Sequence, residues 1–388
     1  MISNKYKKIY NEFIENYEKI HVNPYHEINK EELNKMYDEM VSKIDIDDEY
    51  SFSYFVNYII KRLSGLEDAH TKYRKGRSLP VNFRIFDNEV FVNYPNDLKY
   101  GKLISINDIE VNNILDELDN VITYGTNGKK ISELENALFN KNLMFGLPIF
   151  KKSDILNYKV KTKNKEIKII SFNKNKDYDD EMFDYEKYIF GEPGEYNFID
   201  NCLIYKHSSV QMMYKDKIEE SINKLKEENL SNIDTIIIDL RGNIGGNSNL
   251  NKFLIDFLKE HLDKKLICLT DYRVFSAGRW ALLDLINLGA ITIGDEIGTP
   301  LNCYGNNANI RIDEHSFAIS EKYFQPFYQI TDILTKESFN KIMTKELLKP
   351  VMFKPDILVK QTKEDYLDNV DTILEYALEY SKQKNLKM

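Results

Sequence analysis

Hydrophobic positions near the start of the chain recur at intervals of three and four residues. The stretches "YKKIYNEFIENYEKI" (6–20) and "SYFVNYIIKRLSGL" (53–66) both follow this spacing, which is typical of amphipathic helices. Gly65 lies near the end of the second stretch, and "LEDAHTKYR" after it has the character of a turn. Residues 1–75 are therefore predicted to form a helical segment.

The pattern changes to alternation between residues 76 and 175. "NFRIFDNEVFVNY" (82–94) breaks at Asp-Asn and "NYKVKTKNKEIKIISF" (157–172) breaks at Lys-Asn-Lys, so both predict hairpins. Between them, "GKLISINDIEVNNILDELDNVI" (101–122) predicts a strand, a tight turn and a helix. This order resembles a PDZ-like module, in which "LISINDIEV" is similar to a piece that usually contains "ING". The resemblance implies an α+β module over 76–175.

Strands and helices alternate in the C-terminal half, after a polar, acidic stretch (173–198) that has the character of a linker. "DTIIIDL" (234–240) is a continuous apolar run, as expected for a strand buried on both faces. The alternation that follows indicates βαβ units with parallel pairing. "EDYLDNVDTILEYALEYSKQ" (364–383) predicts a final amphipathic helix. The fold class is mixed α/β, with a third domain over 176–388.

Length, charge and cysteine content limit the classes of protein to which this chain can belong. A chain of 388 residues is long enough for two or three domains. The formal net charge is -9, so neither nucleic acid nor an anionic membrane is expected as a partner. Cys202, Cys268 and Cys303 show no CxxC spacing. The first twenty residues lack the apolar stretch expected of a secretory signal, and no run approaches roughly 18 apolar residues. We expect a cytoplasmic protein without a disulfide framework.

Two loops of the βαβ region carry candidate chemistry. "DLRGNIGGN" (239–247) directly follows the buried strand, and its glycines leave backbone N–H groups bare enough to stabilise an oxyanion; a simple tight turn is the alternative. "TDYRVFSAGRW" (270–280) comes one βα unit later, so the two loops should lie side by side. Ser276 lies where a helix begins. From the spacing alone, it is either the cap of that helix or a nucleophile.

Four motifs occur in the order found in one family. "DLRGNIGG", "VFSAG", "GDEIGTPLNCYGN" and "FKPDILV" resemble the C-terminal-processing (tail-specific) peptidases and their tricorn-core relatives, over roughly residues 50 to 380. The resemblance implies a cofactor-free serine peptidase with a crotonase/ClpP-like catalytic domain. It implies Ser276 as the nucleophile and an oxyanion hole formed by the amide of Ala277 with one from Gly245 or Gly246.

The resemblance also indicates which residue activates the serine. The tail-specific branch uses a lysine in a "GEPTFGKG"-like segment, but Thr299 or Pro300 occupies the corresponding place in this chain. The tricorn-like branch uses a histidine in "DSHT" or "DGHT", and this chain has "DAHT" at 68–71. His70 is therefore the implied general base, and the ordinary pKa of histidine suits that role. The alternative for His70 is an ordinary surface or capping histidine.

Several residues depart from the family pattern. Ala69 stands where the tricorn-like branch has a serine, and Lys349 stands roughly where it has a glutamate. The acid that would orient the imidazole is therefore open between Glu346 and Glu321, with Glu321 preferred. Arg279 follows the small pair at a place where related peptidases often carry an acid.

Three functions follow from these residues. The first is a serine endopeptidase that cleaves peptides or unfolded protein segments, which the PDZ-like module would dock by β-augmentation. The second is a catalytically degenerate relative that binds a peptide or another ligand, and the third is crotonase-like acyl-CoA chemistry. His207 is a second choice as base. No metal-ligand spacing is found among the six histidines, so no metal is expected. A homo-oligomer is left open.

Overall fold

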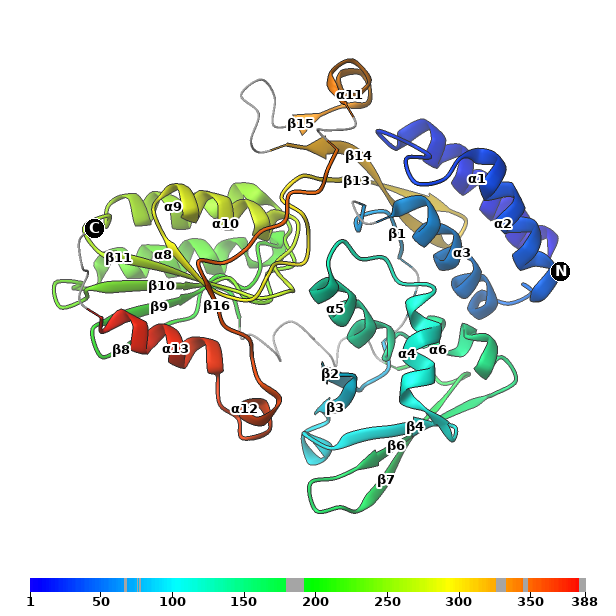
Figure 1. The fold of residues 1–388 in the computed structure, drawn as a ribbon, viewed down its shortest axis with the longest axis horizontal. Helices are drawn as coiled ribbons and strands as arrows, with labels where there is room; N and C mark the ends of the chain where they lie inside the picture. The colour runs from blue at the N-terminus through cyan, green and yellow to red at the C-terminus, as the bar shows by residue number, and fades with distance from the viewer. Residues whose placement is uncertain are drawn as a thin grey trace. The chain divides into compact units, whose positions relative to one another are not determined.

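The computed structural model describes residues 1–65, 68–74, 76, 78–178, 192–325, 333–344 and 348–383. Its contacts divide the chain into two compact units, whose elements are drawn in Figure 1. Unit 1 comprises Met1–Phe183 and Pro300–Val351, and unit 2 comprises Asp184–Thr299 and Met352–Met388. The predicted boundary at 175/176 lies close to the end of the first segment of unit 1. The division differs from the prediction in assigning residues 300–351 to unit 1 rather than to the domain over 176–388.

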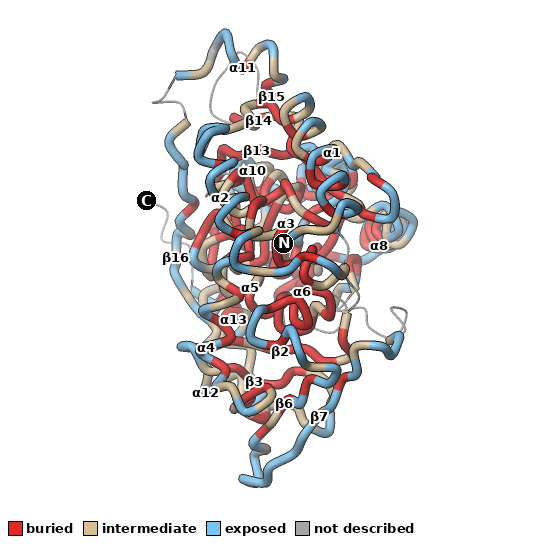
Figure 2. The backbone as a smooth tube through the Cα atoms, turned by 90° about the vertical axis from the view of Figure 1, so that its right-hand side faces the viewer, coloured by how far each residue is buried: buried red, intermediate tan, exposed pale blue. Residues whose placement is uncertain are grey.

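Unit 1 begins with the predicted helical segment. α1 (Asn4–Ile20), α2 (Lys30–Lys43) and α3 (Glu49–Ser64) confirm it, and Gly65 ends α3 with a φ of 55°. α3 is buried along most of its length (Figure 2). The remaining α-helices in the described part of unit 1 are α4 (Val111–Asp119), α5 (Asn127–Ala137), α6 (Lys141–Gly146) and α11 (Lys336–Ile342).

A small antiparallel sheet in unit 1 explains why residues 300–351 belong to it. β1 (Lys72–Tyr73) pairs with β14 (His315–Phe324), which pairs in turn with β13 (Cys303–Ile312) and β15 (Ile333–Leu334). Helix α1 packs on this sheet, and the ring of Phe13 stacks on that of Phe317 with centroids 4.6 Å apart. The DAHT motif therefore leads directly into a strand whose partner lies about 250 residues later, as the pairing of Lys72 with Ala318 shows.

The second sheet of unit 1 confirms both predicted hairpins. Its strand order is β2-β3-β4-β6-β7, with β5 paired to β4. The first hairpin turns at Asp87 and Asn88, whose φ angles of 48° and 64° suit Asp and Asn better than most residues. The strands are β2 (Asn82–Phe86), β3 (Glu89–Tyr94), β4 (Lys102–Ile106), β5 (Ile109–Glu110), β6 (Ile155–Lys161) and β7 (Ile167–Asn173). The likeness to a PDZ module stays a prediction.

Unit 2 is built on a six-stranded sheet with the order β16-β12-β11-β10-β9-β8. All neighbouring pairs are parallel except β8 with β9, so the predicted βαβ units are confirmed. The strands are β8 (Tyr196–Ile199), β9 (Cys202–Lys206), β10 (Thr235–Asp239), β11 (Lys265–Thr270), β12 (Ile291–Gly294) and β16 (Ile357–Leu358). Every residue of β10 is buried, as its apolar run predicts.

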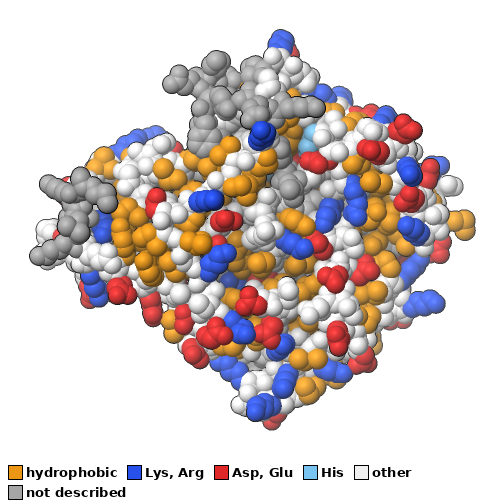
Figure 3. Space-filling model, viewed as in Figure 1, with side chains coloured by type: hydrophobic (Ala, Val, Ile, Leu, Met, Phe, Trp, Pro, Cys, Tyr) orange, Lys and Arg blue, Asp and Glu red, His pale blue; other side chains and the backbone are white. Residues whose placement is uncertain are grey.

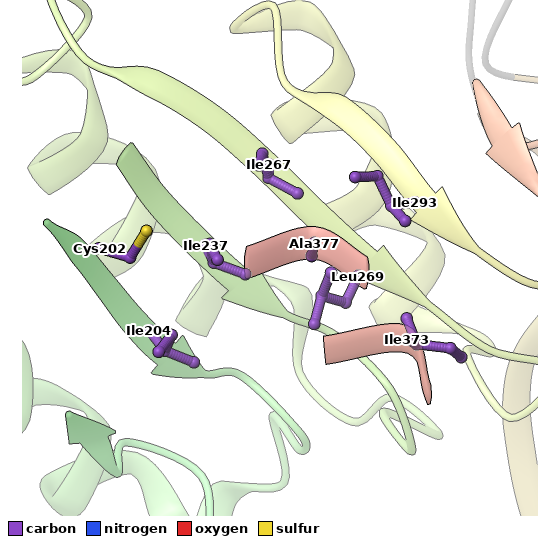
Figure 4. Packing of buried hydrophobic residues seen from close by; sticks show 8 residues of the cluster. All are labelled: Cys202, Ile204, Ile237, Ile267, Leu269, Ile293, Ile373 and Ala377. Atoms are coloured by element: carbon purple, nitrogen blue, oxygen red, sulfur yellow. The ribbon is translucent and has the colours of Figure 1, made fainter. Parts of the chain in front are cut away.

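Helices cover both faces of this sheet (Figure 1). One face carries α8 (Lys215–Glu227), α9 (Asn251–Lys259) and α10 (Ala277–Asn287), and the other carries α13 (Thr372–Ser381). On the α13 side, aliphatic side chains from four neighbouring strands pack under Ile373 and Ala377 (Figure 4). This packing makes β10 and β11 rigid supports for the loops that follow them.

The predicted helix over 364–383 is interrupted. The structure has α12 (Lys363–Leu367) and then α13, which begins at Thr372. Asn369 between them has a φ of 60°, a left-handed conformation that an α-helix cannot contain. The side chain of Asp371 then caps α13 by accepting the amide of Leu374. The single-helix prediction is wrong because the pattern does not reveal this local turn.

The surface shows lysine, arginine and acidic side chains interspersed over the face seen in Figure 3. The three cysteines are buried, and none of them forms a disulfide bond. None of the helices in the described part of the chain is long and apolar enough to cross a membrane. The predicted linker over 173–198 includes residues 179–191, which lie outside the described residues.

Candidate active site

Ser276 has a backbone conformation that is unusual for a residue with a side chain. It precedes α10 with a φ of 51° and a ψ of -119°, and its side chain makes no capping hydrogen bond to the helix. Such conformations cost of order 1–3 kcal/mol and are concentrated at functional sites. Ser276 therefore lies at the N-terminus of α10, as expected, but its side chain does not cap the helix. The serine is half-buried, whereas Phe275 and Ala277 on either side of it are buried.

The glycine loop after β10 lies directly against this serine turn. A Cβ atom on Gly245 would lie 2.7 Å from both the amide nitrogen of Ala277 and the Cβ of Ser276. The amide of Phe275 donates to the carbonyl oxygen of Asn243 at 2.9 Å. β10 and β11 are parallel neighbours, so their carboxyl ends bring the two loops together. The prediction that these loops lie side by side is confirmed.

Two backbone amides beside Ser276 have no acceptor. In the part of unit 2 that the structure describes, neither Ala277 nor Gly246 donates its N–H to another residue. The first-turn amides of a helix lack intrahelical partners and lie at the positive end of its dipole. The amide of Gly245, by contrast, donates to Asn243 Oδ1 at 2.9 Å. Of the two predicted glycines, Gly246 has the amide that could bind an oxyanion. Gly245 leaves room beside Ser276 because it lacks a side chain.

Two buried asparagines each tie one of the loops to a neighbouring segment, and the sequence alone did not single them out. Asn243 Nδ2 donates to the carbonyl of His207 at 2.6 Å, and Asn251 Nδ2 donates to the carbonyl of Ala277 at 3.2 Å. Both asparagines are almost fully buried. The signal available in the sequence was the placing of Asn243 between glycines and of Asn251 at the start of a helix. Buried amides of this kind hold the serine turn in one conformation.

His207 belongs to the same network. Its Nε2 lies 3.0 Å from Asn251 Oδ1. Because Asn251 Nδ2 donates to a carbonyl, Oδ1 is the acceptor and His207 Nε2 carries a proton. Burial lowers the pKa of His207 to about 4, against the opposing effect of that hydrogen bond. A fully buried, neutral imidazole bonded to an amide suits a structural role better than the role of second-choice base.

A buried ion pair anchors the start of the glycine loop. Arg241 Nε and Nη2 donate to the two oxygens of Asp239 at 2.8 and 2.7 Å, and Arg241 Nη1 and Nη2 donate to Asp371 at 2.6 and 2.7 Å. Next to it, Asp271 Oδ1 accepts the amides of Gly242 and Arg273, both at 3.0 Å. Together these bonds hold the residues that directly follow β10 and β11 at the carboxyl edge of the sheet.

His70 lies in unit 1, at the start of β1. It is buried, and its amide donates to Asp68 Oδ1 at 3.1 Å. Its imidazole packs over the backbone of β13, since a Cβ atom on Gly305 would lie 3.4 Å from His70 Cε1. Burial with a polar loop around it shows that His70 is not an ordinary surface histidine.

The predicted orienting acid does not lie beside the Asp68 loop. Glu321 is half-buried and accepts a hydrogen bond from Asn306 Nδ2. Successive residues of a strand point to opposite faces, and Ser320 is the one whose hydroxyl reaches Asp68. Lys349 is exposed. Glu346, the other predicted candidate, lies outside the described residues.

No group of three or more His, Cys, Asp or Glu side chains in the described residues is arranged to hold a metal ion. Arg279, the third departure from the family pattern, is buried with its guanidinium 4.6 Å from the ring centroid of Trp280. It therefore packs inside unit 2.

No protein-family model and no curated protein matches the chain. Among solved structures, a serine-to-alanine mutant of CPAF matches with a TM-score of 0.59 and 10% identity, over 90% of each chain. Mature CPAF in complex with lactacystin matches with a TM-score of 0.58 and 10% identity, over 91% of this chain and 92% of that chain. The photosystem II D1 C-terminal processing protease matches with a TM-score of 0.44 and 8% identity, over 98% of each chain. The likeness to CPAF shows a shared fold.

Proposed function

We propose that this chain is a serine peptidase that forms an acyl-enzyme through Ser276, with His70 as general base. The observation that carries the proposal is the conformation of Ser276, which has a positive φ and a side chain that does not cap α10. The two amides beside it that lack acceptors support the same chemistry, as does the fold shared with CPAF. The pairing of Ser276 with His70 rests on the order of the sequence motifs.

In the first step, Ser276 Oγ bonds to the carbonyl carbon of the substrate while the imidazole of His70 takes the hydroxyl proton. The carbonyl oxygen becomes an oxyanion and accepts hydrogen bonds from the amides of Ala277 and Gly246. Donors held in place before the reaction need no reorganisation, and losing one costs about 10²- to 10³-fold in rate. The positive end of the α10 dipole stabilises the same charge.

In the second step, protonated His70 gives its proton to the leaving amine as the peptide C–N bond breaks. A water molecule then attacks the acyl-enzyme, and His70 takes one proton from it. The bond from the acyl carbon to Ser276 Oγ breaks, the serine recovers its proton, and the carboxylic acid product leaves. Every proton in this cycle moves through one imidazole, so the reaction needs no cofactor.

The substrate we propose is a peptide or an unfolded protein segment. The PDZ-like part of the proposal concerns the sheet of β2, β3, β4, β6 and β7, whose edge strands are β2 and β7. The amide of Ile85 in β2 already donates to Glu135 of α5 at 2.9 Å. An extended substrate segment would therefore add more easily along β7 than along β2.

Labelling with a fluorophosphonate probe tests the proposal. We expect wild type to be labelled with a rate that rises from about pH 5 to about pH 8, as a histidine base loses its proton. Ser276→Ala and His70→Ala should both lose labelling. Ser248→Ala is the matched control, because Ser248 is exposed at the end of the same glycine loop, and it should be labelled like wild type.

The second candidate function is a ligand-binding protein without catalysis. The observation that favours it is the position of Glu321, which is bonded to Asn306 instead of serving a histidine. A wild type that stays unlabelled but binds unfolded peptides would support it. Stabilisation by coenzyme A in a thermal-shift assay would instead support acyl-CoA chemistry. Since mature CPAF has been solved with lactacystin, we also expect lactacystin to compete with the probe if the peptidase proposal holds.

A further inference from the structure

We infer that Asp68 and His21 are positioning residues for His70, so that helix α1 takes part in the active site through its last turn. The inference rests on the proposed function, in which His70 is the general base. All the residues it uses lie in unit 1. It assigns a role to the first residue of the DAHT motif, which the family resemblance left without one.

Asp68 is completely buried, and each of its oxygens is bonded. Oδ1 accepts the amide of His70 at 3.1 Å, the amide of Thr71 at 3.0 Å and the hydroxyl of Ser320 at 2.6 Å. Oδ2 lies 3.1 Å from His21 Nε2. A carboxylate that accepts the amides two and three residues further on closes a tight Asx-type turn. That turn determines where the Cα–Cβ bond of His70 points.

The tautomer of His21 follows from its neighbours. Its Nδ1 accepts the amide of Asn23 at 3.1 Å, so the proton of a neutral ring is on Nε2 and is donated to Asp68. His21 caps the C-terminus of α1 and is completely buried. Its ring stacks on His26, with centroids 5.3 Å apart, and lies 5.1 Å from the ring of Tyr304. The imidazole is therefore held in one orientation on every side.

The carboxylate of Asp68 is stabilised as an anion by the hydrogen-bond donors around it. Burial alone would raise the pKa of Asp68, but the hydrogen bonds from His21, Ser320 and Thr71 outweigh it and hold the pKa well below its usual range. A buried carboxylate without such partners is strongly destabilising. The conformation of the loop is therefore less stable when His21 or Ser320 is removed.

The position of His70 depends on this loop because Asp68 Oδ1 holds the amide of His70 itself at 3.1 Å. Its Cε1 faces β13, 3.4 Å from where a Cβ atom on Gly305 would lie. A change in the turn at Asp68 would move the whole side chain, since two successive amides would lose their acceptor. General-base catalysis needs hydrogen-bond distance to the serine hydroxyl, so a shift of this kind should slow the reaction without changing substrate binding.

The test is the rate of fluorophosphonate labelling as a function of probe concentration and pH, together with thermal unfolding of each variant. Asp68→Asn should lower the maximal labelling rate by tenfold or more. The NH₂ group of the new asparagine must face either His21 Nε2–H or the three donors that now bond to Asp68 Oδ1. In both arrangements a donor meets a donor, so hydrogen bonds are lost. His21→Ala should act in the same direction, whereas His21→Gln should recover much of the rate, because its amide can accept from Asn23 and donate to Asp68. Ser320→Ala removes a single hydroxyl donor and should slow labelling about fivefold.

His315→Gln is the matched control. His315 is also completely buried in the same small sheet, and its Nδ1 is bonded to Tyr73 Oη at 2.7 Å, away from Asp68. We expect it to lose stability as the His21 variants do while it keeps the labelling rate. In the Ser320 variant, which changes no charge, the half-saturating probe concentration and the midpoint of the pH profile should stay near their wild-type values.

The outcomes separate the inference from the proposed function. A wild type that is never labelled overturns the proposed function and this inference with it. A labelled wild type whose Asp68→Asn and Ser320→Ala variants react at the wild-type rate overturns only the inference. So does a loss of rate that His315→Gln shows equally, because the effect would then follow stability. If Asp68→Asn does not fold, Ser320→Ala decides the matter.

Discussion

The backbone of Gly278 lies so close to Asn243 that a Cβ atom at position 278 would be 2.4 Å from the carbonyl oxygen of Asn243. The same carbonyl accepts the amide of Phe275 at 2.9 Å. Ser276 lies between these two contacts along the chain. The approach of the glycine loop to the serine turn therefore holds Ser276 in its positive-φ conformation, which isolated chain segments would rarely adopt.

Gly278→Ala should weaken both the fold and the proposed site. The new methyl group meets backbone and cannot be accommodated by rotation of a side chain, so we expect a loss of about 1–3 kcal/mol in the free energy of unfolding. Chemical denaturation measures this loss, and probe labelling of Ser276 should slow more than the stability change explains. Ala281→Gly, in the same helix, is the control for a change in helix propensity. Labelling of Gly278→Ala at the wild-type rate would show that the serine turn does not depend on this contact.

His207 should be dispensable for labelling but should make stability depend on pH. Its folded pKa of about 4 lies below the ordinary value of 6.5, so the unfolded chain binds the additional proton between these values. Stability should therefore rise with pH across this window. His207→Gln should flatten that rise in denaturation curves and should keep probe labelling. Loss of labelling in a folded His207→Gln variant would instead make His207 the base.

Asn251→Asp should change the protonation of His207. A carboxylate at this position would replace the amide oxygen 3.0 Å from His207 Nε2, and a negative charge favours the protonated imidazole. We expect the pKa of His207 to rise from its present value of about 4, which NMR titration of the ring protons would measure. Asn251→Ala provides the comparison without a charge. An unchanged pKa in the Asp variant would contradict the hydrogen bond between these side chains.

Asp371 should stabilise the fold most above its ordinary pKa. Burial opposes ionisation, but the bonds from Arg241 and the amide of Leu374 lower the pKa of Asp371 overall. A carboxyl group with a lowered folded pKa contributes stability that is present above about pH 4 and is lost as the pH falls below it. Asp371→Asn should therefore be less stable at neutral pH, and the difference from wild type should shrink in acid. A difference that stays constant down to about pH 2 would contradict the ion pair as its source.

Local patterns predicted the elements well where one physical rule governs a segment. The spacing over 6–20 predicted α1, the apolar run at 234–240 predicted the buried strand β10, and the Asp-Asn break predicted the first hairpin. The alternation of strands and helices predicted a parallel sheet. Each of these follows from hydrophobic periodicity or turn preference, which depends on neighbouring residues only. The break at Asn369 escaped because asparagine adopts left-handed and helical conformations alike.

The sequence by itself determined the candidate nucleophile and base, because Ser276 and His70 lie in recognisable motifs, and it determined the helical and parallel-sheet character of the chain. Only the tertiary structure decided that Ser276 does not cap its helix, that Gly246 rather than Gly245 has a spare amide, and that His21 and Ser320 meet at Asp68. These three findings depend on backbone dihedral angles and on hydrogen bonds between residues far apart in the sequence. The two bonds to Asp68 join residues 47 and 252 positions apart. No local pattern contains such information, since distant partners are chosen by packing.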